Sequence, residues 1–113
     1  MKKTILVDLD GVLNTYTGDF NKDFIPPIRD GAFEFIKNLS DKYIVKIFTT
    51  RSMIQASEWV LKNNLKEYIS DVTNIKEPNY LMIDDRCIKF EGDFNLLEHK
   101  IKDFNTWYQS GVI

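Results

Sequence analysis

Short apolar runs recur along the chain and are separated by polar, turn-rich segments. Five runs have the length and the aliphatic or aromatic content of β-strands, and they lie at residues 5–7, 43–48, 69–72, 80–83 and 88–90. The first run is continuous and aliphatic, which is typical of a strand that is buried on both faces. We therefore expect a sheet of about five strands.

Helical spacing of apolar residues fills most of the intervals between these runs. Asp30 can cap a helix that ends near Asp41, and Ser52 to Gln55 has the form of a capping box that opens a second helix. Asp93 can cap a closing helix. The apolar face of this last helix would comprise Phe94, Leu97, Ile101, Phe104 and Tyr108. Strands that alternate with helices of this length predict an α/β fold whose parallel sheet has right-handed crossovers.

The composition favours one folded domain that spans residues 1–113. Hydrophobic residues make up 43% of the chain, which is enough for a packed core without a disulfide or a structural metal. The segment 14–29 is too long for a simple connector, and its glycine and proline residues argue against a helix. We interpret it as a short flap over the end of the first strand.

The charge and the cysteine content indicate which kinds of partner and which cellular compartment the protein suits. The formal charge is -2 and the basic residues are scattered, so that no basic face for a nucleic-acid backbone is evident. Cys87 is the single cysteine and fits a reducing compartment. No apolar run approaches the roughly 20 residues of a membrane span, and Asp8 and Asp10 cut the first apolar run far below the length that a signal peptide needs. We expect a cytoplasmic protein without a membrane partner.

Polar side chains stand at the expected carboxyl ends of three strands. Asp8 and Asp10 follow the first run, Thr49 follows the second, and the pair Asp84–Asp85 follows the fourth. Because the carboxyl ends of parallel strands share one edge of a sheet, these groups should converge. Clustered carboxylates raise each other's pKa unless a cation intervenes, and Mg²⁺ prefers oxygen ligands. The sequence therefore predicts a Mg²⁺ site, to which Lys76 can add a positive charge.

The segments LVDLDGVL, KIFTT, NIKEPNY and LMIDD occur in this order. They resemble the motifs of the haloacid dehalogenase-like (HAD) phosphatases, which are an Asp-x-Asp-Gly strand end, a strand ending in Thr or Ser, a Lys, and a strand ending in an acidic pair. The four motifs span most of the chain, and their combined order is far more specific than any one motif. The resemblance implies a three-layer Rossmann-like fold and a Mg²⁺-dependent phosphoric monoester hydrolase.

The resemblance also implies roles for the acids. Asp8 would be the nucleophile that forms an aspartyl-phosphate, and Asp10 would protonate the leaving oxygen and later activate water. The Mg²⁺ ligands would be the Asp8 carboxylate, the backbone carbonyl of Asp10 and an acid of the later pair. By position Asp84 is the member of that pair that we expect to bind the ion directly. Asp85 would either bind the ion as well or contact the groups that bind it.

Phosphate and substrate contacts are expected next to these acids. The resemblance implies that Thr49 and Lys76 bind the phosphoryl oxygens. Two arginines directly follow motifs and would either bind a substrate anion or form ion pairs with the acidic edge. The further candidate substrate contacts are Thr50, Arg51, Arg86 and Asn14.

The spacing of the motifs leaves no room for a separate cap domain, and the chain resembles the capless members of the family. An open site implies a large phosphorylated substrate, or a cap supplied by a neighbouring subunit of a homo-oligomer.

Two other hypotheses compete with the phosphatase. A phospho-accepting receiver domain uses similar residues, but it places an acidic pair first, the acceptor Asp mid-chain and the Lys last, whereas here Lys76 precedes the acidic pair. The second is a HAD-fold binding or regulatory module with weak or no turnover.

Overall fold

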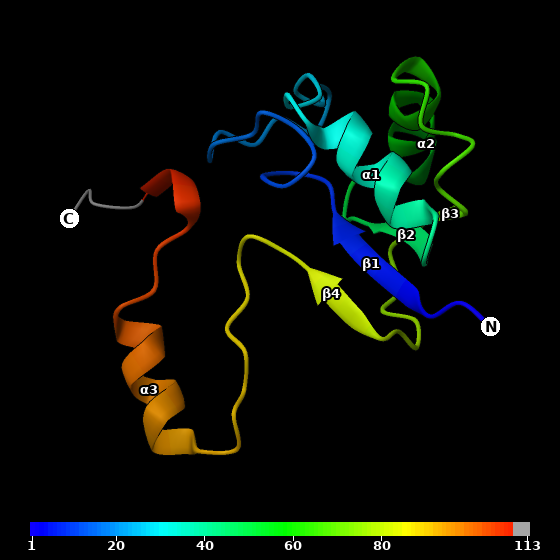
Figure 1. Ribbon diagram of the computed structural model, residues 1–113. Helices are drawn as coiled ribbons and strands as arrows, with labels where there is room; N and C mark the ends of the chain where they lie inside the picture. Colours follow the sequence, from blue (N-terminus) through cyan, green and yellow to red (C-terminus); the bar gives the residue numbers. More distant parts are fainter. Residues whose placement is uncertain (110–113) are drawn as a thin grey trace.

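The computed structural model describes residues 1–109, which contain one parallel sheet of four strands (Figure 1). The strands are β1 (Thr4–Asp8), β2 (Ile44–Phe48), β3 (Asp71–Thr73) and β4 (Leu81–Ile83). Their order across the sheet is β3-β2-β1-β4, and every pairing is parallel. The expected α/β, broadly Rossmann-like fold is confirmed, but with four strands among the described residues.

The fifth strand that the sequence predicted at residues 88–90 is not formed. The chain leaves the sheet after β4 and runs through an irregular segment, in which the Phe90 ring packs against Phe94 with ring centroids 5.2 Å apart. The apolar run here is only two residues divided by Lys89. A pattern this short does not distinguish a strand from a loop, and no described strand lies beside it to supply hydrogen bonds.

Three α-helices and one short 3₁₀ helix complete the described chain. They are α1 (Ala32–Ser40), α2 (Met53–Lys62), α3 (Phe94–Lys102) and η1 (Trp107–Gln109). The predicted caps of the last two α-helices form, because the Ser52 side chain accepts a hydrogen bond from the Gln55 N–H and Asp93 accepts two from the first turn of α3.

Asp30 does not cap α1, in contrast to the prediction from the sequence. The helix begins only at Ala32, so that Gly31 occupies the N-cap position with a left-handed φ of 87° and no side-chain cap. Glycine adopts this left-handed conformation without strain, whereas Asp30 would adopt it only with strain. The N-cap is therefore Gly31, one residue later than predicted.

The core lies between the sheet and the first two helices. Since β1, β2 and β3 follow one another across the sheet, right-handed crossovers place α1 and α2 on the same face. Alternate strand residues such as Val7 and Ile47 are fully buried there against Ile36 and Trp59. The whole buried cluster comprises Ile5, Val7, Leu9, Leu13, Ala32, Ile36, Val45, Ile47, Ala56, Trp59, Val60, Leu65, Ile69 and Val72.

Helix α3 stands apart from this core (Figure 1). None of its residues is buried, and Phe94 and Ile101 are 74% and 59% exposed. The radius of gyration is accordingly 15.0 Å, whereas about 13 Å is usual for a domain of this length. The third layer implied by the family resemblance is therefore not formed by α3. Among the helices of residues 1–109, none has the length and apolar character needed to cross a bilayer.

The segment 14–29 folds back on itself beside the carboxyl end of β1. Asn14 and Ile28 form an antiparallel bridge, and the Thr15 N–H donates to the Pro27 carbonyl over 2.9 Å. This bridge joins the two ends of the segment 14–29, and we call that segment the flap. Two of its aromatic side chains reach the site described next.

Candidate functional site

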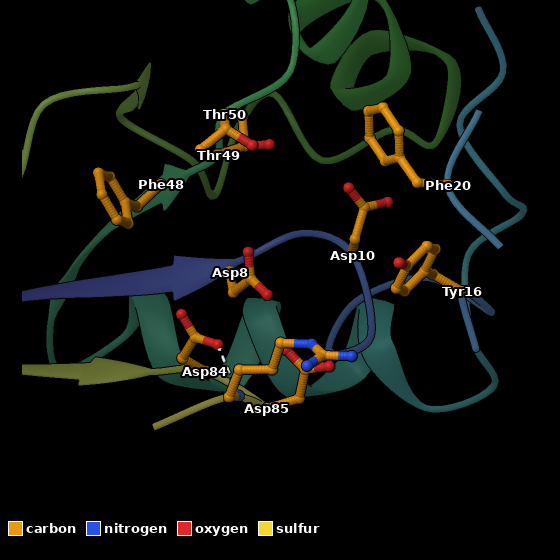
Figure 2. A pocket seen from close by; sticks show the side chains of 10 residues that line it. Asp8, Asp10, Tyr16, Phe20, Phe48, Thr49, Thr50, Asp84 and Asp85 are labelled. Atoms are coloured by element: carbon orange, nitrogen blue, oxygen red, sulfur yellow. Dashed lines mark hydrogen bonds between the residues drawn. The ribbon is translucent and has the colours of Figure 1, made fainter. Parts of the chain in front are cut away.

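A cavity of about 290 Å³ opens at the carboxyl edge of the sheet (Figure 2). Its walls come from the ends of β1, β2 and β4 and from the flap. The lining residues are Asp8, Asp10, Tyr16, Phe20, Phe48, Thr49, Thr50, Asp84, Asp85 and Arg86. The structure thus brings together the acids and the threonine that the sequence pointed to, although they are far apart along the chain.

Three carboxylates form a tight cluster on one side of this cavity. Asp8, Asp84 and Asp85 each offer an oxygen, and these oxygens all lie within 4.8 Å of one another. The register of β1 on β4, in which Val7 is opposite Ile83, makes Asp8 and Asp84 neighbours. We call these three residues the acidic triad.

The triad has the chemistry of a site for a hard divalent cation. Oδ2 of Asp85 is buried and has no hydrogen-bond partner, and a buried carboxylate oxygen without a partner is costly. Carboxylate oxygens that converge in this way suit Mg²⁺, which binds proteins through one or two carboxylates and keeps several waters. The residues present therefore fit the expected ion.

Burial and mutual repulsion make the triad hard to ionise. The pKa of Asp8 is raised to about 8 by burial, by the charge of Asp84 and by the neighbouring Asp85 carboxyl. Burial also raises the pKa of Asp84. A cation between the carboxylates would remove this penalty, since an opposite charge favours the ionised form.

Gly11 leaves space for one member of the triad. It is buried, its φ is +84°, and a Cβ atom at this position would overlap the Asp85 carboxylate. Any other residue would therefore be strained twice, by its backbone conformation and by its contact with Asp85. This explains the glycine of the Asp-x-Asp-Gly sequence.

The Asp10 carboxylate belongs to a second network. Its Oδ1 accepts a hydrogen bond from Asn14 Nδ2 over 3.0 Å, and its Oδ2 pairs with Arg51 Nε over 2.7 Å. These two donors fix the carboxylate at the cavity wall, outside the triad. Metal binding through the backbone carbonyl of Asp10 stays a prediction.

Asn14 is a buried positioning residue whose side chain is already hydrogen-bonded within the protein. The side chain is fully buried, its Oδ1 accepts hydrogen bonds from the N–H groups of Gly11 (3.2 Å) and Tyr16 (3.0 Å), and its Nδ2 is used by Asp10. It does not line the cavity. The sequence suggested it as a substrate contact, and in the structure its side chain joins the turn after β1 to the start of the flap.

Arg51 is likewise held inside the protein rather than offered to a substrate. It is 4% exposed, pairs with Asp10, donates from Nη1 to the Asn21 carbonyl over 2.8 Å, and lies over the Phe20 ring at 4.6 Å. Of the two readings left open by the sequence, the ion pair with the acidic edge is the one that forms. Its Nη2 is buried without a partner.

The two threonines after β2 both line the cavity. The Thr49 side chain is buried, and its Oγ1 accepts the Arg51 N–H over 3.1 Å. A hydroxyl that accepts one hydrogen bond still has its own proton to donate. Thr49 is therefore suited to bind an anionic oxygen, while Thr50 is exposed at the rim.

Lys76 is not brought to the cavity. It is exposed and does not belong to the lining. The neighbouring Glu77 pairs with Lys46 over 2.6 Å, which ties the connection between β3 and β4 to the sheet and leaves Lys76 outside. Among the lining residues the positive charge comes from Arg86, whose guanidinium also donates to the Tyr108 hydroxyl over 3.3 Å.

Sequence reasoning assigned no site role to the C-terminal segment. Trp107 Nε1 donates to the Gly11 carbonyl over 2.7 Å, and the Tyr108 ring packs edge-on against Tyr16 with centroids 6.2 Å apart. Both contacts join residues more than ninety positions apart, and no short motif carries such a signal. The aromatic residues of the flap were visible in the sequence, but their spacing did not separate packing from ligand contact.

Comparisons with known proteins bear on the fold. A scan against protein families gives no match, and no curated protein matches the sequence. A solved structure of a conserved protein from Bacteroides thetaiotaomicron is similar over 95% of both chains, with a TM-score of 0.60 and 22% identity. At this identity the similarity shows a shared fold and nothing about activity.

Proposed function

We propose that this protein is a Mg²⁺-dependent phosphatase that hydrolyses phosphate monoesters through an aspartyl-phosphate on Asp8. The observation that carries the proposal is the acidic triad, whose oxygens lie within 4.8 Å of one another beside Thr49 at the carboxyl edge of a parallel sheet. The order of the four HAD-like motifs supports the same activity. Arg86 and Thr49 would be the phosphate-binding groups nearest the triad.

In the first step an Asp8 oxygen attacks phosphorus and the bond from phosphorus to the ester oxygen breaks. Asp10, when protonated, gives its proton to the departing alcohol. In the second step Asp10 takes a proton from water, the water oxygen attacks phosphorus, and the bond to Asp8 breaks to release inorganic phosphate. A Mg²⁺ ion held by the triad would neutralise the carboxylates and the phosphoryl charge. Positioning and charge neutralisation account for most catalysis of this kind.

A second candidate is a HAD-fold binding module with little turnover. The position of Lys76 outside the cavity favours it, because the phosphoryl group would then lack one expected cationic contact. The Arg51 ion pair with Asp10 also favours it, since Asp10 must release that contact partly to handle a proton.

Hydrolysis of a panel of phosphate esters with Mg²⁺ separates the two candidates. The phosphatase should release inorganic phosphate, EDTA should abolish the release, and added Mg²⁺ should restore it. Asp8→Asn should abolish turnover, whereas Asp19→Asn, an exposed flap residue outside the cavity lining, should leave it unchanged. Folded protein that hydrolyses no ester would contradict the phosphatase proposal and favour the binding module.

A further inference from the structure

The two ends of the cavity have different chemistry. The acidic triad and Thr49 occupy one end, where the phosphoryl group would be bound. In Figure 2, Tyr16 and Phe20 lie beyond Asp10 as seen from Asp8, so that Asp10 stands between the triad and two aromatic rings. The cavity therefore has its acids at one end, where Phe48 also lies, and two aromatic rings beyond Asp10 at the other.

The Phe20 ring is held in place although it is 57% exposed. The Arg51 guanidinium lies over its face, with the central carbon 4.6 Å from the ring centroid. That guanidinium is itself anchored to Asp10 over 2.7 Å and to the flap backbone at Asn21. The ring thus has a fixed position relative to Asp10, which an exposed phenylalanine on a free loop would lack.

The Tyr16 ring is supported from the opposite end of the chain. Tyr108 packs edge-on against it at an interplanar angle of 79°, and Trp107 packs edge-on against Tyr108 with centroids 5.3 Å apart. Trp107 is in turn bonded to the Gly11 carbonyl. These contacts preorganise an aromatic wall, which we define as Tyr16 and Phe20, with Tyr108 behind Tyr16 as its support.

The position of Asp10 relates this wall to the substrate. A group that protonates the leaving oxygen must lie within hydrogen-bond reach of it, so the alcohol part of the ester extends past Asp10. Past Asp10 it meets Tyr16 and Phe20. The lining side chains at this end are therefore the two rings, of which Tyr16 also carries a hydroxyl.

We infer that the preferred substrate is a phosphate monoester whose alcohol carries a flat aromatic ring, bound between Tyr16 and Phe20. This inference rests on the proposed function and specifies its leaving group. Flat rings gain from offset or edge-on packing beyond the burial of apolar area, whereas saturated rings gain only the area. The ring belongs either to an aryl or benzylic ester or to a nucleoside monophosphate.

A matched pair of substrates tests the inference with intrinsic reactivity held nearly constant. Benzyl phosphate and cyclohexylmethyl phosphate both release a primary alcohol of similar size, and only the first ring is flat. We expect kcat/KM to be about two- to twelvefold higher for benzyl phosphate, the range that one aromatic pair supports. Values within twofold, or a preference for cyclohexylmethyl phosphate, would overturn the inference while leaving the phosphatase proposal intact.

Two leucine variants locate the preference. Phe20→Leu should lower the benzyl-to-cyclohexylmethyl ratio, because only the Tyr16 ring then remains to pack against the substrate ring. Phe24→Leu is the matched control, because Phe24 is also in the flap and equally exposed at 57%, but does not line the cavity. A ratio that survives Phe20→Leu, or falls equally in both variants, would contradict the assignment of the aromatic wall.

Binding of inert analogues keeps the inference testable if turnover is absent. Benzylphosphonate should bind more tightly than cyclohexylmethylphosphonate in the presence of Mg²⁺, as measured by calorimetry. Equal binding, or no binding of either, would overturn the inference. Thymidine 5′-monophosphate measured against deoxyribose 5-phosphate, and O-phosphotyrosine measured against O-phosphoserine, then distinguish the two sources of the ring. A lack of preference for the aromatic member in both pairs would again overturn it.

Discussion

The raised pKa of Asp8 predicts an unusual dependence of stability on pH. In the folded protein without metal this carboxyl titrates at about 8, against an ordinary value of 3.8. The folded state therefore holds a proton that the unfolded state has lost between these two values. Stability falls as pH rises wherever the folded state binds more protons. Without metal, the protein should thus be less stable at pH 8 than at pH 6.

The magnitude follows from the two pKa values. Between pH 6 and pH 8 the unfolded carboxyl is ionised throughout, while the folded one is almost fully protonated at pH 6 and about half ionised at pH 8. Linkage then gives a loss of about 2 kcal/mol in the free energy of unfolding over this interval. For a domain of this size the loss corresponds to a decrease in Tm of roughly 6 to 12 °C. The raised pKa of Asp84 acts in the same direction.

Thermal unfolding in EDTA, followed by circular dichroism at several pH values, checks this expectation. Asp8→Asn removes the titrating group and should flatten the dependence, whereas the exposed Asp19→Asn should keep it. Addition of Mg²⁺ should stabilise the wild type more at pH 8 than at pH 6, because binding at the lower pH must first displace a proton. A wild-type Tm that is constant or rises from pH 6 to pH 8, or an Asp8→Asn slope equal to that of the wild type, would refute the reasoning.

Further predictions concern the supports of the site. Gly11→Ala should destabilise the protein more than Gly92→Ala, because Gly92 has a similar φ of +89° but open space for a Cβ atom. Each substitution carries a backbone cost of about 1 kcal/mol or more. Equal losses of stability in urea unfolding would argue against the overlap with Asp85. Arg51→Gln should cost about 2 to 4 kcal/mol, because it leaves Asp10 without its buried partner. Lys100→Gln, at an exposed pair, should cost less than about 1 kcal/mol, and a similar loss in both variants would contradict this account. Isothermal calorimetry should detect Mg²⁺ binding that Asp84→Asn weakens, and unchanged affinity would exclude the triad as the site.

The strands and the triad could be predicted because the information that specifies them is local. A continuous aliphatic run predicts β1, and acids directly after β1 and β4 must meet when both strands lie in parallel next to each other. Burial of Ala56 and Trp59 on α2 also follows from helical spacing. In each case a few neighbouring residues determine the outcome.

Features that depend on distant contacts could not be predicted. Nothing near Arg51 in the sequence indicates that its guanidinium would lie between Asp10 and Phe20. The same holds for Trp107, which bonds the turn after β1 from the far end of the chain. Lys76 lies outside the cavity because its neighbour Glu77 forms an ion pair, and the partner in that ion pair is on strand β2. Residues that are distant in the sequence determine where these side chains lie, so their positions can be known only from the folded structure.

Detection of a phosphoryl group on Asp8 tests the central claim most directly. Asp10→Asn, supplied with Mg²⁺ and p-nitrophenyl phosphate, should form the aspartyl-phosphate readily, because this leaving group needs no proton. It should then hydrolyse the intermediate slowly, because the base that activates water is missing. Mass spectrometry of acid-quenched peptides should find the phosphoryl group on the peptide that contains Asp8, and not in the Asp8→Asn, Asp10→Asn double variant. Release of phosphate by the wild type without any phosphorylated Asp8 peptide in Asp10→Asn would contradict the account.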